Sequence, residues 1–416
     1  MSSKSAVWHP FTQHAVQPEA ILVDGAEGAW LQTPDGRRIF DAVSSWWVVT
    51  HGHRHPHIVQ AIKQQIDRLD QVIFAGFTHQ PAETLARQLV AITPPELEYV
   101  FFSDSGSTSV EVALKMALGF WRHRGEGRSR ILALQGAYHG DTIGGMSVGE
   151  RGVFNAPYDP LLFDVERLPF PHPGSEPATL EALKAACRSG TIAALIVEPL
   201  ILGAGGMLIY PPWVLSEMKQ ICRAHDVLFI ADEVMTGWGR TGTLFACEQA
   251  EITPDIACYS KGLTGGSLPL AVTLCRADIF EAHYSTDRSR TFFHSSSYTA
   301  NPVACAAAVA NLEIWQREPV TARIDRIAAT HKRRLDGFRD DRRFANVRQI
   351  GTIAAFDIVT PDAGYLATIG PQLYRDFLAR DVLIRPLGNT IYLMPPYCSS
   401  DSELDAVYDA IDGVVT

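Results

Sequence analysis

Between about residues 99 and 275, short apolar runs alternate with stretches of helical periodicity, and this alternation constrains the fold more than any other feature. The runs lie at 99–104, 130–135, 191–199, 227–234, 255–260 and 270–275. They are continuously apolar, which is typical of strands that a parallel sheet buries on both faces. Helical stretches such as 107–123 and 212–225 separate them. The sequence therefore predicts an α/β fold, with a mostly parallel sheet covered by helices.

The segments on either side of this region have other patterns. Residues 29–41 predict two strands joined by a turn at Pro34-Asp35-Gly36, and helical periodicity follows at 56–69 and 81–92. A long helical region begins at 301, and strand-like runs and a last helix after about 340 indicate a small α+β domain. We expect an N-terminal segment that contributes to the small domain and the active site, then a large domain, then a small C-terminal domain. The predicted ranges are 1–60, 61–320 and 321–416.

Composition excludes several classes of function. The net charge of -10 gives no basic surface of the kind that binds nucleic acid. The seven cysteines are scattered without a paired motif, which favours reduced thiols over a disulfide framework. The longest apolar run is interrupted by Glu198 and Pro199, and the opening residues lack the apolar stretch of a signal peptide. We expect a cytoplasmic protein that binds neither nucleic acid nor membrane.

The ends of three predicted strands bear unusual residues. One strand ends in Asp232-Glu233, another in Lys261, and a third in Ser105-Gly106-Ser107 just before a helix. Each has a purely structural interpretation, such as a capping box from Thr108 to Glu111, a turn cap at Asp232, or a loop position for Lys261. However, an ammonium at the end of an apolar strand costs solvation energy unless it is paired or used chemically. Because ligands bind at the carboxyl ends of the strands in such sheets, a shared site is the stronger hypothesis.

These residue types together favour the chemistry of pyridoxal phosphate. A lysine amine condenses with the cofactor's aldehyde, and an aspartate holds the pyridine nitrogen protonated, so that the ring accepts electrons. Amides at a helix N-terminus, here those of Gly106 and Ser107, bind a phosphate. Tyr138 and His139, which follow another strand, offer an aromatic ring beside the cofactor. The sequence therefore predicts Lys261 as both the cofactor's covalent partner and a proton shuttle.

Several stretches resemble the class III aminotransferases of the fold type I pyridoxal-phosphate enzymes. They are "SDSGSTSVEVALKMA", "YHGDT", "IVEPLILGAGGM", "LFIADEVMTGWGRTG", "DIACYSKGLTGG" and "SYTANPVACAAA", and the resemblance spans nearly the whole chain. It implies that Lys261 forms the internal aldimine, that Asp232 contacts the pyridinium, and that Tyr138 stacks on the ring. It also implies a homodimer with active sites at the subunit interface. The stretch 294–298, with Ser295, Ser296 and Ser297, would then reach the phosphate bound by the partner chain.

Other residues indicate the substrate. Trp46 and Trp47 would form an aromatic wall for a long aliphatic chain, and Arg385, with Tyr392 nearby, would clamp a distant carboxylate. "WHPFT", "SSWW" and "IRPLGNTIYLMPPY" resemble the branch of the family that aminates the keto acid 8-amino-7-oxononanoate in biotin synthesis, with S-adenosylmethionine as amino donor. That branch usually has a tyrosine where Phe11 stands, and a G-P-T segment in place of the three serines. Both departures concern the donor.

Three alternatives stay open from the sequence. The chain could be a transaminase that acts on another ω-amine or ω-amino acid with pyruvate, or a binding protein that keeps the cofactor without turnover. The complete set of Lys261, Asp232 and Tyr138 disfavours the second. Arg240 could hold a substrate carboxylate or brace its loop.

The histidines of "HGHRHPH", 51–57, alternate as metal ligands on a strand do. However, Gly52 and Pro56 indicate a turn, so no metal site is expected.

Overall fold

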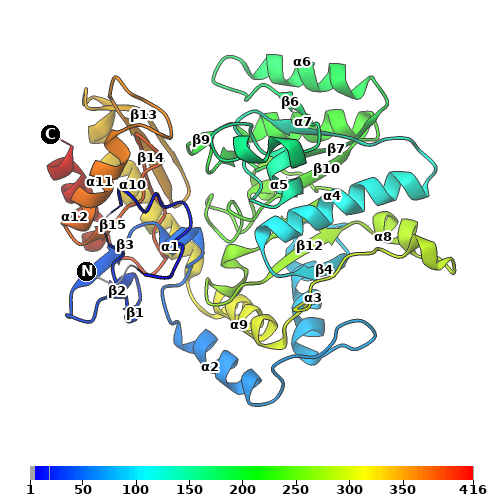
Figure 1. The fold of residues 1–416 in the computed structure, drawn as a ribbon, viewed down its shortest axis with the longest axis horizontal. Coiled ribbons are helices and arrows are strands. Elements are labelled where there is room, and N and C mark those ends of the chain that lie inside the picture. The colour runs from blue at the N-terminus through cyan, green and yellow to red at the C-terminus, as the bar shows by residue number, and fades with distance from the viewer. Residues whose placement is uncertain (1–4, 18, 416) are drawn as a thin grey trace.

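The computed structural model describes residues 5–17 and 19–415. A seven-stranded sheet runs through its larger part, in the order β4-β12-β11-β10-β7-β5-β6 (Figure 1). Its strands are parallel except β12, which is antiparallel to both of its neighbours because its connection from β11 is too short for a crossover helix. The predicted α/β fold is confirmed. The strands are β4 (Tyr99–Ser103), β5 (Arg130–Leu134), β6 (Glu166–Leu168), β7 (Ile192–Val197), β10 (Leu228–Asp232), β11 (Ile256–Tyr259) and β12 (Ala271–Cys275).

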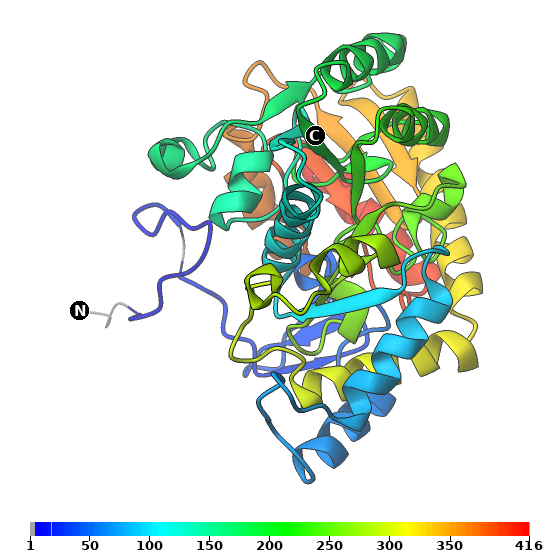
Figure 2. The ribbon, with the colours of Figure 1, turned by 90° about the vertical axis from the view of Figure 1, so that its right-hand side faces the viewer.

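Apolar side chains from both faces of this sheet enter separate cores. Leu195 and Val197 of β7 pack in the core that contains α6 and α7, whereas Ala194 and Ile196 pack in the core beneath α4. Burial on both faces explains why the strands are continuously apolar. Figures 1 and 2 show the helices in layers around the sheet. They are α2 (Pro56–Ile66), α3 (Gln80–Ile92), α4 (Gly106–His123), α5 (Ile143–Val148), α6 (Glu176–Cys187), α7 (Pro212–Ala224), α8 (Ala277–His283) and α9 (Pro302–Arg317).

A second part of the fold joins the two ends of the chain. β1 (Gly25–Glu27), β2 (Trp30–Gln32) and β3 (Arg38–Asp41) form a four-stranded sheet with β15 (Val382–Leu383), and β3 is parallel to β15. A three-stranded antiparallel sheet and three helices lie beside it, at the left of Figure 1. The N-terminal strands thus pack with the C-terminal segment, although the three domain ranges given above stay a prediction. The further elements are β13 (Phe344–Ile350), β14 (Ile353–Ile358), β16 (Thr390–Leu393), α10 (Val320–Arg339), α11 (Ile369–Leu378) and α12 (Asp401–Val414).

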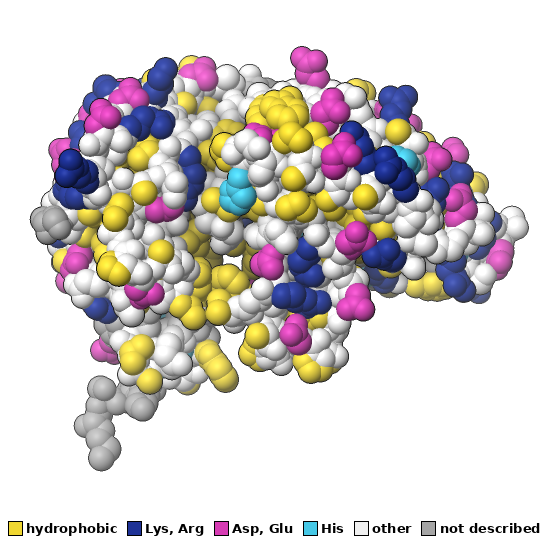
Figure 3. All heavy atoms as spheres, turned by 90° about the horizontal axis from the view of Figure 1, so that it is seen from above, with side chains coloured by type: hydrophobic (Ala, Val, Ile, Leu, Met, Phe, Trp, Pro, Cys, Tyr) yellow, Lys and Arg dark blue, Asp and Glu magenta, His cyan; other side chains and the backbone are white. Residues whose placement is uncertain are grey.

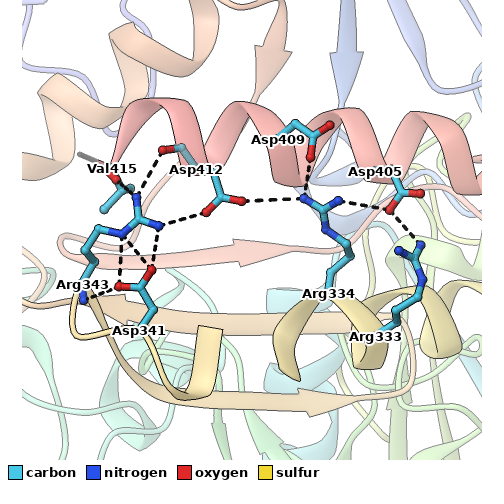
Figure 4. A network of polar contacts seen from close by, with 8 residues as sticks. All are labelled: Arg333, Arg334, Asp341, Arg343, Asp405, Asp409, Asp412 and Val415. Carbon is cyan, nitrogen blue, oxygen red and sulfur yellow. Dashed lines mark hydrogen bonds and ion pairs between the residues drawn. The ribbon is translucent and has the colours of Figure 1, made fainter. Parts of the chain in front are cut away.

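Ion pairs join α10 to α12 on the surface of this second part (Figure 4). Arg333 Nη2 lies 2.8 Å from Asp405 Oδ1, and Arg334 Nη2 lies 2.6 Å from Asp409 Oδ1. Exposed pairs of this kind each contribute at most about 1 kcal/mol to stability. The apolar face of α12, with Val407 and Ile411 fully buried, therefore holds the helix in place.

Short elements complete the chain. The hairpin of β8 (Ile201–Leu202) and β9 (Leu208–Ile209) follows β7, and α1 (Ser44–Trp47) follows β3. Single 3₁₀ turns lie at η1 (Ala156–Leu161), η2 (Ala246–Ala250), η3 (Lys261–Thr264) and η4 (Arg288–Arg290). Across the described ranges, no helix is long and apolar enough to cross a membrane.

Candidate active site

A cavity of about 430 Å³ lies where the carboxyl ends of the large sheet face the second part of the fold. Figure 3 shows apolar side chains along the hollow between the two parts. Most of the residues that the sequence predicts for the site line this cavity. They are Phe11, Trp46, Trp47, Gly106, Ser107, Tyr138, Asp232, Lys261, Arg385 and Tyr392.

Lys261 follows β11 and begins the turn η3, with a left-handed backbone at φ 45°. Its Nζ lies 4.5 Å from the centre of the Trp47 ring. Burial lowers the pKa of this amine to about 8, and Arg240 acts in the same direction, while the carboxylates of Asp232 and Glu198 oppose the shift. At pH 7 about a tenth of the amine is therefore unprotonated and nucleophilic, far more than for a lysine with its ordinary pKa.

Asp232, the last residue of β10, is bonded on both carboxylate oxygens. Oδ2 lies 2.7 Å from His139 Nδ1, and Oδ1 accepts a hydrogen bond from Val234 N at 3.1 Å. His139 is also buried, and its Nε2 has no hydrogen-bond partner among the described residues. The histidine thus orients the carboxylate from the side. The sequence offered His139, with Tyr138, only as an aromatic residue beside the cofactor ring and predicted no contact with Asp232.

Glu198 is a second buried carboxylate that lines the cavity. Its oxygens accept hydrogen bonds from Tyr138 N at 3.0 Å and Gly203 N at 2.9 Å. Burial raises its pKa to about 7, partly opposed by nearby His139. No role for this residue is predicted from the sequence. Its position could have indicated a role, because it is a charged residue immediately after the wholly apolar strand β7.

The N-terminus of α4 lies at one side of the cavity. The first amides of a helix have no intrahelical acceptor, and those of Gly106 and Ser107 stand at the cavity wall. A Cβ on Gly106 would lie 2.7 Å from Val234 Cγ1, and one on Gly140 would lie 2.1 Å from Ser107 Oγ. Both glycines are therefore required for this close approach of backbone segments. The arrangement suits a phosphate group.

The capping box of α4 differs from the one considered in the sequence. Ser105 Oγ accepts from Thr108 N at 3.2 Å, and Thr108 Oγ1 accepts from Ser105 N at 3.0 Å. Glu111 instead accepts a hydrogen bond from Gly144 N at 2.6 Å. A box from Thr108 to Glu111 is therefore wrong, because the helix begins at Gly106 and not three residues later.

Tyr138 presents its ring to the cavity, and its hydroxyl donates to Asp141 Oδ2 at 2.9 Å. Burial and, to a smaller extent, the nearby Asp141 carboxylate raise the pKa of the phenol. The hydroxyl therefore stays protonated at any ordinary pH. The hydrogen bond fixes the ring as one wall of the cavity, which suits the stacking role that the family resemblance implies.

Trp46 and Trp47 both face the cavity, although adjacent residues of a strand would point to opposite sides. The pair does not lie in a strand but in α1, which is interrupted at Ser45 with φ 60° and ψ −87°. Trp47 is buried and its Nε1 donates to Tyr392 Oη at 2.9 Å. Trp46 stands at the mouth, 40% exposed, with its ring 5.5 Å from that of Phe11.

Arg385 lies at the same mouth. Its Cζ is 5.0 Å from the centre of the Trp46 ring, and its Nη2 donates to the Phe11 carbonyl at 3.1 Å. Two further aromatic residues, Phe154 and Tyr365, line the cavity with ring centres 4.4 Å apart, and Phe154 lies 6.0 Å from the Phe11 ring. Neither is predicted from the sequence, because nothing in their surroundings marks them. The mouth thus combines one guanidinium with several aromatic rings.

The three predicted serines do not line the cavity of their own chain. Ser296 Oγ donates to Asp104 Oδ2 at 2.7 Å, and Ser295 Oγ donates to the Ser296 carbonyl at 3.1 Å. Ser297 is exposed, and its carbonyl accepts from Gln71 Nε2 at 2.8 Å. Their predicted contact with a partner's phosphate stays a prediction.

Arg240 is buried behind the cavity rather than in its wall. Its Nη1 donates to Pro395 O at 3.0 Å, and its Nη2 donates to Val49 O at 2.9 Å. Of the two interpretations left open by the sequence, bracing is the one that this geometry supports. Arg240 fixes the backbone next to Trp47.

The histidines of 51–57 do not converge on a common point. Each contacts a different acceptor, and no cluster of three or more candidate metal ligands occurs in the part of the chain that the structure describes. The pairs are His51–Asn311, His53–Asp41, His55–Glu318 and His57–Glu313.

The residues of the cavity fit a phosphate-bearing aldehyde cofactor with a basic ring nitrogen. A buried amine, a buried carboxylate, an aromatic wall and free helix amides occur at its inner end. His139 Nε2, beside Asp232, is buried without a hydrogen-bond partner among the described residues. This part of the cavity can therefore still bind a polar group. Each chemical group of pyridoxal phosphate thus has a counterpart in the wall.

The chain is similar to known proteins over nearly its whole length. Residues 11–415 match the family described as Aminotransferase class-III. A relative from Synechococcus elongatus, named adenosylmethionine-8-amino-7-oxononanoate aminotransferase, is 48% identical over 99% of this chain and 98% of its own length. The crystal structure of a protein with the same name from Methanocaldococcus jannaschii gives a TM-score of 0.93 at 33% identity, covering 98% of this chain and 97% of that chain. An amine transaminase from an uncultivated Pseudomonas species, solved in its PLP-bound internal aldimine form, gives 0.94 at 31% identity, covering 100% and 99%.

Proposed function

The chain belongs to the class III aminotransferase family, and on this premise we propose that it aminates 8-amino-7-oxononanoate in biotin biosynthesis, with S-adenosylmethionine as donor. The product is 7,8-diaminononanoate. The enzyme is a transaminase and its cofactor is pyridoxal phosphate. When bound, this cofactor supplies the aldehyde that takes up the amino group and the ring that accepts electrons.

The residues of the inner cavity would hold the cofactor and move the proton. Lys261 Nζ would bind the aldehyde and, once released by a substrate amine, would take a proton from the substrate carbon and return it. Asp232, oriented by His139, would keep the ring nitrogen protonated. Gly106 and Ser107 would bind the phosphate through their amides, and Tyr138 would stack on the ring. These roles fit the geometry and remain our proposal.

The observation that carries the substrate assignment is the mouth of the cavity. Arg385 and the rings of Trp46 and Phe11 lie together there, and both rings are exposed whereas Asp232 is buried. A long keto acid would lay its methylene chain against the rings and place its distal carboxylate at Arg385. Its ketone could then reach Lys261 while the carboxylate stays at the edge.

A second candidate is a transaminase for other ω-amines or ω-amino acids. The amine transaminase of known structure supports it, because its TM-score of 0.94 equals that of the first candidate's neighbour to within 0.01. The identities favour the first candidate, at 48% for the relative from Synechococcus against 31% for the amine transaminase. A cofactor-binding protein without turnover is the distant alternative.

One assay separates these candidates. Purified enzyme is given 8-amino-7-oxononanoate, pyruvate or a simple aldehyde as acceptor, each with S-adenosylmethionine, lysine or an ω-amine as donor, and the aminated products are measured by mass spectrometry. The proposed function requires 7,8-diaminononanoate with S-adenosylmethionine. Alanine formed from pyruvate and an ω-amine, without 7,8-diaminononanoate, would support the second candidate. No product with any pair would support the binding protein.

We also infer that two copies of the chain assemble, and that each completes the other's site. Gln71 and Asn301 join the segments 70–77 and 293–301, which lie side by side. These segments bear large exposed apolar side chains that a partner would cover: Ile73, Phe77, Phe293 and Tyr298. On this surface Ser295, Ser296 and Ser297 are available to the phosphate held by the partner. Sedimentation velocity at micromolar concentration tests the assembly.

A further inference from the structure

The turn η3 that begins at Lys261 has an unfavourable backbone. Lys261 itself has φ 45°, and Gly265 and Gly266 follow with φ 65° and 88°. A left-handed conformation is uncommon for a residue with a side chain, and it persists only where surrounding contacts fix it. The position of the Lys261 amine therefore depends on whatever holds this turn.

Asn311 of α9 makes the most direct contact with the turn. Its Nδ2 donates to two carbonyls of the turn, Gly262 O and Leu263 O, each at 3.1 Å. Its Oδ1 lies 2.9 Å from His51 Nε2. The side chain is fully buried, in a helix whose other buried residues are apolar. Burial of an amide is costly unless it is bonded, and here both of its donors are used.

His51 fixes the orientation of that amide. Because Oδ1 of Asn311 is an acceptor, His51 Nε2 must bear the hydrogen, and Nδ1 has no partner within the described ranges. Burial lowers the pKa of His51 to about 3, so the ring is neutral at working pH. Its ring packs edge-on against Trp315 and Tyr397, at 5.7 and 6.1 Å between centres. The imidazole is therefore a rigid donor.

We propose that Asn311 and His51 are positioning residues for Lys261, which together hold the turn η3 so that the lysine amine points into the cavity. On the other side, a Cβ on Gly262 would lie 2.7 Å from Trp238 Cβ, so the turn is packed there without a gap. The hydrogen bonds from Asn311 Nδ2 hold the turn η3 from the opposite side. The inference rests on the proposed role of Lys261 and also accounts for one histidine of the 51–57 stretch.

The test is made first on the apoenzyme, because it then depends on neither substrate nor cofactor. Asn311→Leu keeps the approximate volume of the side chain and removes all three hydrogen bonds. His51→Leu removes the donor to Asn311, whereas His51→Gln keeps an N–H near the Nε2 position. His331→Leu is the matched control, since His331 is also fully buried and bonded, to Tyr408 Oη at 2.8 Å and Thr352 O at 3.2 Å, but neither bond reaches the turn η3 or Asn311.

Two measurements follow each variant. Hydrogen exchange is measured on the peptide 260–268 against a peptide of β7, and the labelling of Lys261 by an amine-directed reagent is measured from pH 6 to pH 10. We expect Asn311→Leu and His51→Leu to speed exchange in 260–268 by about tenfold or more, with the β7 peptide unchanged. The midpoint of Lys261 labelling should rise from its wild-type value, since a looser turn admits water to the ammonium. His51→Gln should show smaller changes than His51→Leu.

The holoenzyme gives the second arm. Loss of the Asn311 bonds should lower kcat by about ten- to a hundredfold with little change in KM for the keto acid, because the amine is displaced while the mouth is intact. His331→Leu should lower the melting temperature and leave exchange in 260–268, the labelling midpoint and kcat as in wild type. If Asn311→Leu lowers only the melting temperature, as His331→Leu does, the proposal is overturned. Should Asn311→Leu not fold, equal behaviour of His51→Leu and His51→Gln would overturn it in the same way.

Discussion

His139 Nδ1 lies 2.7 Å from Asp232 Oδ2, and both side chains are buried at the inner end of the cavity. The histidine comes from the segment after β5 and the aspartate from the end of β10, so the contact joins two strand ends of the same sheet edge. With Val234 N on its other oxygen, the carboxylate has a single orientation. A carboxylate fixed in this way can keep a cofactor nitrogen protonated throughout a reaction.

The first prediction concerns this carboxylate. Asp232→Asn keeps the size of the side chain but removes the negative charge, so the protein should bind cofactor and lose about a hundredfold or more of its transamination rate. Glu233→Gln is the matched control. Glu233 is the next residue in the sequence, and its carboxylate is also buried. It accepts hydrogen bonds from Thr236 Oγ1, Ala246 N and Cys247 N, away from the cavity. This substitution should lower stability with little effect on kcat. Full activity in Asp232→Asn together with a large loss in Glu233→Gln would transfer the role to Glu233.

The second prediction concerns the pKa of Lys261. Since the neutral amine is the nucleophile, the rate at which apoenzyme takes up pyridoxal phosphate covalently should rise with pH around a midpoint near 8. The same shift affects stability. The folded amine loses its proton near pH 8 while the unfolded amine keeps it to about 10.5, so the free energy of unfolding attributable to this group should increase between these values. It should be constant below pH 8.

Lys261→Met provides the comparison for both measurements. It should not attach the cofactor, it should show negligible turnover, and its unfolding free energy should lack the rise between pH 8 and 10.5 that wild-type apoenzyme shows. Urea titrations of both proteins over this range give the difference directly. A wild-type uptake midpoint above 10 would contradict the influence of burial on this amine.

The fold and the inner cavity could be predicted because both follow from local sequence. Continuous apolar runs indicated strands such as β7, in which every residue is buried. Lys261 and Asp232 stood out as charged residues at the ends of such runs. Glu198 has the same position after β7, but we interpreted it only as an interruption of an apolar run. Its carboxylate is stabilised by Tyr138 N and Gly203 N, contacts that only the folded chain brings together.

The mouth of the cavity could be predicted only in part, because it depends on contacts between distant segments. The bond from Arg385 to the Phe11 carbonyl joins residues 374 positions apart. The common direction of Trp46 and Trp47 requires positive φ at Ser45, which no sequence pattern indicates for a serine. Likewise, no sequence pattern indicates that Asn311, a polar residue in an otherwise apolar helix, contacts His51.

A third prediction tests the carboxylate clamp. Arg385→Ala should raise KM for the keto acid by about ten- to a hundredfold, because a charge-assisted bond to the carboxylate is lost. Cofactor binding should not change, since Arg385 lies at the mouth. The methyl ester of the keto acid serves as the internal control. Wild-type enzyme should prefer the acid and Arg385→Ala should not. If wild type used acid and ester equally well, Arg385 would not be the clamp.

A fourth prediction tests the shared site. Ser297→Asp would place a negative charge beside the partner's phosphate, and Lys261→Ala removes the amine, so homodimers of either variant should be inactive. A heterodimer purified through two different tags has one site with both lesions and one intact site. It should therefore regain about half of the wild-type activity. A heterodimer no more active than its inactive parents would mean that Ser297 serves its own chain, and an active Ser297→Asp homodimer would mean that Ser297 does not bind phosphate.

The last prediction concerns the amino donor. The Phe11 ring lies against Trp46 at 5.5 Å and Phe154 at 6.0 Å between centres, and it is 44% exposed at the mouth. A phenylalanine offers the same stacking face to adenine as the tyrosine usual in the family, and a tyrosine would add one hydrogen bond worth about 0.5–1.5 kcal/mol. We therefore expect S-adenosylmethionine to serve as donor, and Phe11→Tyr to change its KM by only a few-fold. KM for the keto acid should stay constant, because Arg385 contacts the Phe11 carbonyl and not its ring. The first half-reaction, followed by the cofactor's absorbance with S-adenosylmethionine and with lysine separately, decides the matter. A response to lysine alone would replace the donor while leaving the fold, the cofactor and the keto acid in place.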